Sequence, residues 1–130
     1  MGSNKTTVGN AAGVSAATFT AAGQDSGPLL FNVCTGYEKW VFQLTGSGTG
    51  YAVTIYGTLD RDTAAGTAVT PQWFALPGQS SEASPAWTNP LTMDSPALAV
   101  NAPLVAVRAV SSALPGGESG SVTLQIFVAP

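Results

Sequence analysis

The sequence predicts an all-β protein, and three observations support this prediction. Several segments alternate between apolar and polar residues with a period of two, as strands with one buried face do. No segment of about eleven residues shows a helical period, and no internal repeat is visible. Glycine and proline, 15 and 9 residues respectively, separate the apolar runs. We therefore expect a single β-sandwich, either jelly-roll or immunoglobulin-like, with an extended N-terminal arm.

Residues 1–27 are small and polar, and they are predicted to form that arm. Val8, Val14 and Phe19 are its sizeable apolar residues. A strand over residues 14–20 would hold its neighbours weakly, because few of its side chains are large. We expect the arm to be ordered by the surface on which it lies.

The sandwich domain is assigned to residues 28–130. It opens with a short apolar run over residues 29–33. Residues 37–44 and 51–59 then each place large apolar side chains on one face and polar ones on the other. The glycine-rich segment 46–50 joins these two strands, which are therefore predicted to pair as a hairpin.

The remainder of the domain contains a short strand over residues 71–76, a long loop and two further strands. Prolines recur through residues 77–102 and remove ladder donors, so this segment is predicted to be a surface loop. Residues 104–110 are apolar on both faces, as in a central strand, and residues 121–128 alternate again. The predicted core consists of Trp40, Phe42, Val53, Ile55, Val105, Val107, Leu124 and Ile126.

Charge is scarce and dispersed. Charged residues make up 8% of the chain, against about 25% in a typical soluble domain, and the net charge is −3. Nucleic acids and anionic membranes both require clustered cations, so neither partner is expected. A surface with so little charge favours burial in an assembly, as a homo-oligomer (dimer or trimer) or on a larger partner. A sticky monomer is the alternative.

No sequence feature indicates export, membrane insertion or disulfide bonding. No run reaches the roughly 18 apolar residues of a membrane span. The N-terminus lacks the charged region and apolar run of a secretory signal. Cys34 is the single cysteine, so no intrachain disulfide is expected, and it is predicted to pack as a small apolar group.

Neither enzymatic activity nor a cofactor or metal is expected. The chain has no histidine, so it cannot assemble a Ser-His-Asp triad or a Cys-His pair. Asp60 and Asp62 could give calcium two oxygen ligands, but the rest of the calcium-loop pattern fails, since residue 64 is Ala. A solvated turn around Arg61 is the preferred interpretation. The glycines of residues 46–50 lack the helix and the Lys-Ser/Thr of a nucleotide loop.

Aromatic side chains could instead form a platform on which a sugar stacks, although protein partners use the same residue types. Trp40 is assigned to the core, whereas Trp87 in the proline-rich loop is the better exposed candidate. Arg108 lies inside an apolar strand, either as a paired, half-buried charge or at a sheet edge that contacts a neighbour. The aromatic candidates are Tyr37, Trp40, Tyr56, Trp73 and Trp87.

The order of these segments resembles that of capsid decoration (cement) proteins and related head-associated β-sandwich proteins of tailed bacteriophages. The resemblance covers about residues 37–76 and 103–128, and it does not extend to the arm or the long loop. It rests on residues 41–46 (VFQLTG), 51–60 (YAVTIYGTLD), 72–76 (QWFAL), 103–109 (PLVAVRA) and 122–128 (VTLQIFV).

The resemblance implies a structural virion protein that decorates and stabilises a bacteriophage capsid by bridging major capsid subunits. Its copies would be made in the host cytoplasm and lie on the outer capsid surface, with the major capsid protein as partner. Three alternatives stay open: another virion component such as a head fibre base or tail protein, a carbohydrate-binding module, and a secreted adhesion domain.

The arm and the long loop are predicted to carry the attachment, because both are poor in packing residues. Phe19, Trp87 and Met93 are the predicted anchors, and Arg108 is a further partner-binding candidate. For Trp87 the alternative is that it folds back as a lid on its own sandwich.

Overall fold

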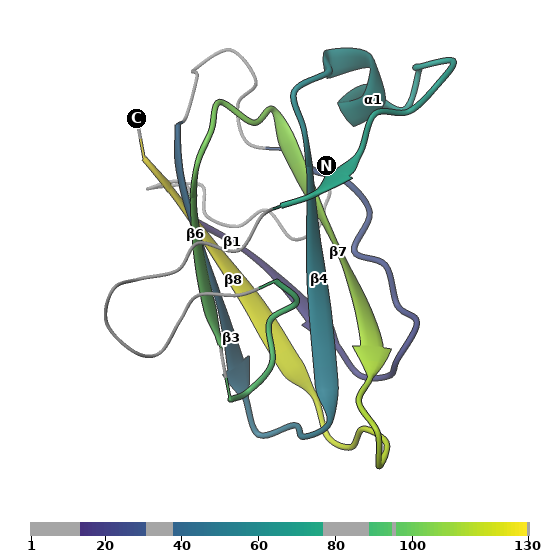
Figure 1. The fold of residues 1–130 in the computed structure, drawn as a ribbon, viewed down its shortest axis with the longest axis vertical. Helices are drawn as coiled ribbons and strands as arrows, with labels where there is room; N and C mark the ends of the chain where they lie inside the picture. Colours follow the sequence, from purple (N-terminus) through teal and green to yellow (C-terminus); the bar gives the residue numbers. More distant parts are fainter. Residues whose placement is uncertain (1–13, 31–37, 77–88, 95, 130) are drawn as a thin grey trace.

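The computed structural model describes residues 14–30, 38–76, 89–94 and 96–129. Within this part of the chain the strands form two four-stranded antiparallel sheets, which confirms the all-β class (Figure 1). The first sheet contains, in spatial order, β1 (Val14–Phe19), β8 (Val122–Ala129), β3 (Lys39–Gly46) and β6 (Ala97–Asn101). The second sheet contains β2 (Leu29–Leu30), β7 (Ala106–Ala113), β4 (Tyr51–Thr58) and β5 (Phe74–Ala75).

Each sheet is built around one long central strand pair. β3 pairs with β8 from Lys39↔Ala129 to Gly46↔Val122, and β4 pairs with β7 from Tyr51↔Ala113 to Thr58↔Ala106. The prediction of a central strand over residues 104–110 is confirmed in position, since β7 begins at Ala106 and lies between β2 and β4. The predicted last strand over residues 121–128 is β8, which lies between β1 and β3.

The two sheets share one hydrophobic core. On β3 every second residue is buried from Trp40 to Leu44, and the Trp40 and Phe42 rings stack with centroids 6.3 Å apart. The predicted core residues are buried except Val105, which lies just before β7 and is half-buried. The largest fully buried side chains are Trp40, Tyr51, Phe19, Phe42, Ile55, Leu91, Leu98, Leu124, Ile126, Val53, Val107 and Val122.

The predicted hairpin between β3 and β4 is wrong. β3 pairs with β6 and β8, whereas β4 pairs with β5 and β7, so residues 46–50 cross from one sheet to the other. Alternation with a period of two identifies each strand but not its partner, because a hairpin and a crossing connection present the same pattern.

The predicted boundaries of the arm and the long loop also need correction. Residues 14–19 of the predicted arm form β1, which pairs with β8 along its whole length. Residues 97–101 of the predicted loop form β6, which pairs with β3. Backbone hydrogen bonds hold both strands, so small side chains do not prevent their pairing. Residues 1–13 and 77–88 lie outside the described residues.

A short helix, α1 (Arg61–Ala65), occupies the segment predicted to be a solvated turn. Five residues are too few to show a helical period in the sequence. No helix in the described part of the chain has the length and apolarity required to cross a membrane.

Two connections between the sheets meet at one end of the molecule. The β3–β4 connection and the β7–β8 connection form a bridge at Thr49 and Ser119, with N···O distances of 2.9 Å in both directions. Gly48 N donates to Ser121 O at 2.8 Å, and the Tyr51 hydroxyl donates to Gly120 O at 2.7 Å. This contact joins strands of both sheets.

Gly50 is required where these two connections meet. Its φ is +75°, and a Cβ added there would overlap the carbonyl oxygen of Gly117. Gly23 has a similar φ of +80° with open space around it. We predict that Gly23→Ala lowers the free energy of unfolding by about 1–2 kcal/mol, the cost of a left-handed backbone. Gly50→Ala should cost about 3 kcal/mol or more, because it adds a steric clash. If urea denaturation showed the same loss in free energy of unfolding for Gly23→Ala and Gly50→Ala, this explanation would be wrong.

Core substitutions test the shared core. Ile55→Ala on β4 and Leu124→Ala on β8 should each lower the free energy of unfolding by about 2–5 kcal/mol, because both side chains are fully buried. Val41→Ala on the exposed face of β3 is the control, with an expected change within about 0.5 kcal/mol. A small effect of Leu124→Ala in urea denaturation would argue against one core between the sheets.

Candidate functional site

Arg108 lies at the centre of a cluster on the outward face of the second sheet. The register places Arg108 of β7 opposite Tyr56 of β4, and Tyr56 in turn opposite Ala75 of β5. The guanidinium carbon of Arg108 lies 5.3 Å from the ring centroid of Tyr56 and 5.3 Å from that of Trp73. At these distances each ring attracts the cation through its quadrupole, so the three side chains hold one another in place.

An ion pair completes this cluster on its other side. Arg108 Nε lies 3.5 Å from Asp25 Oδ2, with 29% of the Arg108 side chain and 48% of the Asp25 side chain exposed. Nε itself is buried and makes no hydrogen bond. A pair this exposed contributes about 1 kcal/mol or less to stability. Its main effect is therefore to orient the guanidinium.

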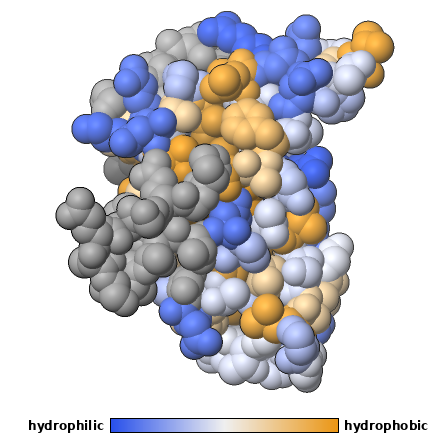
Figure 2. All heavy atoms as spheres, in the orientation of Figure 1, coloured by the Kyte–Doolittle hydropathy of each residue, from blue (hydrophilic) through white to orange (hydrophobic). Residues whose placement is uncertain are grey.

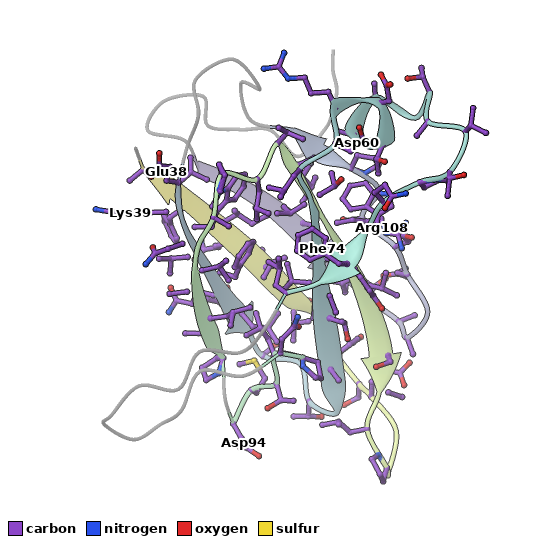
Figure 3. The ribbon with its side chains drawn as sticks, turned by 45° about the horizontal axis from the view of Figure 1, so that its top comes forward. Glu38, Lys39, Asp60, Phe74, Asp94 and Arg108 are labelled. Atoms are coloured by element: carbon purple, nitrogen blue, oxygen red, sulfur yellow. The ribbon has the colours of Figure 1, made fainter. Side chains whose placement is uncertain are left out.

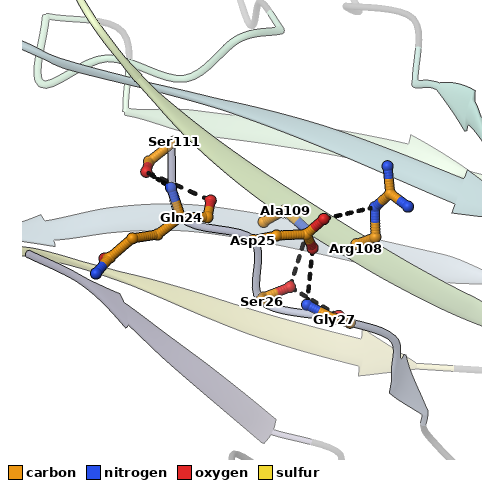
Figure 4. A network of polar contacts seen from close by, with 7 residues as sticks. All are labelled: Gln24, Asp25, Ser26, Gly27, Arg108, Ala109 and Ser111. Carbon is orange, nitrogen blue, oxygen red and sulfur yellow. Dashed lines mark hydrogen bonds and ion pairs between the residues drawn. The ribbon is translucent and has the colours of Figure 1, made fainter. Parts of the chain in front are cut away.

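The segment that carries Asp25 is fixed to β7 by several hydrogen bonds (Figure 4). Asp25 Oδ1 accepts from Gly27 N at 2.8 Å, and Ser26 Oγ accepts from Ala109 N at 2.9 Å. Ser111 Oγ accepts from Gln24 N at 3.0 Å. β7 supplies Arg108 and also the Ala109 and Ser111 groups that hold this segment. The Asp25 carboxylate and the Arg108 guanidinium are therefore fixed relative to each other.

A hollow of about 390 Å³ lies beside the cluster. It is lined by Leu59 and Asp60, which follow β4, by Gln72 and Trp73, which precede β5, and by Phe74, the first residue of β5. Figure 3 shows Asp60, Phe74 and Arg108 in the same part of the molecule, near α1. Figure 2 shows apolar surface in the upper part of the molecule, over the region where β5 lies beside β4.

Asp60 is held in this hollow as the N-cap of α1. Its Oδ2 accepts from Thr63 N at 3.0 Å and from Thr63 Oγ1 at 2.6 Å. Thr63 Oγ1 also accepts from Gln72 N at 2.8 Å, which ties the two walls of the hollow together. These hydrogen bonds to Thr63 favour the charged form and lower the pKa of Asp60 below its ordinary value of 3.8, more than burial raises it.

The outward face of the first sheet forms a second, different surface. Phe127 of β8 is paired with Val41 of β3, and both side chains are exposed, at 37% and 42%. Ala99 of β6 continues this row of register partners across the sheet. Apart from Lys39, the outward positions on the four strands are uncharged. We call this surface the neutral face.

Three of the four predicted partner-binding residues are described by the structure, and they lie in different surroundings. Phe19 is 1% exposed and belongs to the core, so it is not a free anchor, because β1 turns it inward between the sheets. Met93 is 36% exposed, and Arg108 lies in the cluster described above. Trp87 lies outside the described residues, and so does Tyr37.

Sequence reasoning identified part of the cluster and missed the rest. Tyr56 and Trp73 were proposed as sugar-stacking residues, and the structure places both against Arg108. Trp40 is in the core as predicted. The roles of Asp25 and Phe74 were missed, because their proximity depends on which strands pair. Asp60 is of a residue type favoured at helix N-caps, so the sequence did contain a signal for the start of α1.

The described residues offer binding surfaces, and no group of three or more potential metal-ligating His, Cys, Asp or Glu side chains occurs among them. No protein-family model matches the chain, and no curated protein matches its sequence. In fold it is similar to the crystal structure of the SPBc2 prophage-derived protein YomS, with a TM-score of 0.54. The match covers 89% of this chain and 95% of that chain at 14% identity, so the likeness is one of fold.

The Asp60 cap predicts a pH-dependent contribution to stability. Because the pKa of Asp60 is lowered on folding, its contribution is present above pH 3.8 and lost as the pH falls through the lowered value. Asp60→Asn keeps a good N-cap without a titrating group. We expect the melting temperature of the wild type to exceed that of Asp60→Asn near neutral pH, and this difference to shrink below pH 3.8.

Asp94→Asn, which removes an exposed carboxylate elsewhere, controls for the change in net charge. A difference between wild type and Asp60→Asn that stays constant from about pH 6 to about pH 2 would refute the role of the Asp60 carboxylate.

Proposed function

We propose that this chain is a structural, non-enzymatic virion protein that decorates and stabilises a bacteriophage capsid by bridging major capsid subunits. The observation that carries the proposal is the likeness in fold to a prophage-derived protein over nearly the whole of both chains. The order of sequence motifs, which resembles that of phage decoration proteins, supports the same class independently.

The strand order supports a jelly-roll sandwich as the architecture behind this function. The orders β1-β8-β3-β6 and β2-β7-β4-β5 pair the first strand with the last and carry the chain repeatedly between the two sheets. An eight-stranded jelly roll has this arrangement, and capsid and lectin domains both use it. The single cluster of buried residues between the sheets is consistent with such a sandwich.

The neutral face is the surface that we assign to capsid attachment. Its row of Val41 and Phe127 is apolar, and hydroxyl and amide side chains surround it, among them Thr18 and Thr123, whose Oγ1 atoms lie 3.0 Å apart. An exposed apolar row on a face with so few charges favours contact with other proteins. Covering it with capsid subunits, or with further copies of this chain, removes that apolar surface from water.

Binding to purified phage capsids that lack this protein tests the proposal. Wild-type protein should co-sediment with such capsids and raise the temperature at which they release DNA. Phe127→Asp should weaken capsid binding by about tenfold or more, because it places a charge within the apolar row. Phe74→Asp, on the second sheet and 41% exposed, is the matched control and should bind as the wild type does.

Both variants must keep the wild-type melting temperature for this comparison to hold. Failure of the wild type to bind such capsids would contradict capsid decoration. Recovery of the protein with purified tails or head fibres would assign it to another virion component instead. Equal binding by Phe127→Asp and the wild type would show that the neutral face is not the attachment surface.

A further inference from the structure

The hollow beside Arg108 lies on the opposite sheet from the neutral face, so the capsid attachment proposed above would leave it free. We propose that this hollow, lined by Leu59, Asp60, Gln72, Trp73 and Phe74, binds a neutral saccharide, with a sugar ring packed against Trp73. The hollow's volume of about 390 Å³ is within the range of small-molecule sites, roughly 300–1,000 Å³.

The lining has the two kinds of chemistry that a sugar presents. The C–H face of a pyranose is apolar and packs on an aromatic ring, while its hydroxyl groups donate and accept hydrogen bonds. Trp73 and Phe74 supply aromatic surface, and Leu59 is 55% exposed at the margin. The Asp60 carboxylate accepts hydrogen bonds from hydroxyl groups, and the Gln72 amide both donates and accepts them.

The charges around the hollow favour a neutral ligand. Asp60 contributes a carboxylate, and no cation is among the residues that line the hollow. The nearby Arg108 is engaged by Asp25 and by the two aromatic rings. A phosphate, a sulfated sugar or a uronic acid would therefore be repelled by the Asp60 carboxylate, with no cation in the lining to compensate.

The same carboxylate argues against an apolar protein side chain as the occupant. Such a side chain would cover Asp60 and remove water from a charged oxygen without replacing its hydrogen bonds, which is costly. A sugar hydroxyl replaces the displaced water directly. The mixture of aromatic surface with one carboxylate and one amide thus favours a saccharide over a protein segment.

The walls of the hollow are already held in place before any ligand binds. Trp73 packs on Arg108, which is oriented by Tyr56 and Asp25. Asp60 and the backbone of Gln72 are both bonded to Thr63. Side chains that are already fixed lose little conformational entropy when a ligand binds. The free-energy cost of binding a small ligand is therefore lower.

Nuclear magnetic resonance titration of the full chain tests this proposal. The probes are maltotriose, cellotriose, chitotriose and lactose, each added to about 10 mM to detect binding near millimolar affinity. The chain has three tryptophans, so Trp73→Phe identifies the indole N–H signal of Trp73. At least one sugar should shift this signal in a saturable manner.

Two variants and one control locate the binding. Trp73→Ala should weaken binding by about tenfold or more through loss of the stacking surface. Gln72→Ala should also weaken binding while leaving the Arg108 cluster intact, which separates loss of a ligand contact from local unfolding. Phe127→Ala, an exposed aromatic on the neutral face, should bind sugar as the wild type does.

The proposal is overturned if none of the four sugars shifts the Trp73 signal. It is equally overturned if both Trp73→Ala and Gln72→Ala bind with wild-type affinity, because the sugar would then lie elsewhere. Tighter binding of a sulfated heparin tetrasaccharide than of any neutral sugar would refute the assignment of a neutral ligand. Protection of Trp73 by capsids, without any sugar binding, would show that a protein occupies the hollow.

Discussion

The contact between the β3–β4 and β7–β8 connections is the constraint on which the rest of the structure depends. Each connection crosses from one sheet to the other, and the bridge between Thr49 and Ser119 joins them at the crossing. Glycine is needed there because the backbones approach so closely that a Cβ at Gly48 would lie 2.6 Å from the carbonyl oxygen of Ser121. Because the two connections cross between the sheets side by side, β3 lies next to β8 and β4 lies next to β7. The contact therefore determines both central strand pairs.

The Arg108 cluster follows from that pairing. With β4 and β7 in register from Tyr51↔Ala113, Tyr56 falls opposite Arg108. The short β5 then pairs with β4 at Tyr56 and Gly57, which brings the preceding Trp73 over the same guanidinium. A shift of one residue in the register would turn Tyr56 into the core and separate these groups. The hollow is therefore a consequence of strand pairing and not of a local sequence motif.

The sequence was sufficient for properties that depend on one segment at a time. Alternation of apolar and polar residues identified β3, β4 and β8, because a strand with one buried face has apolar residues at every second position. It also placed Trp40 and Leu124 correctly on the buried face. It did not reveal that β1 and β6 belong to the first sheet, because alanine-rich strands leave little hydrophobic pattern. Phe19 was misassigned for the same reason. The cluster could not be predicted because its parts lie on segments that only the sheet order brings together.

The two outward faces differ in chemistry because their central strands differ. On the first sheet the outward positions of β3 and β8 carry Lys39 near one end, amides, hydroxyls and the pair Val41 and Phe127. On the second sheet the outward positions of β4 and β7 carry Tyr56 and Arg108. Since the sheets share one core, these faces point in opposite directions. A copy attached to a capsid through the neutral face would present its hollow to the solvent, so attachment and sugar binding would not compete for the same surface.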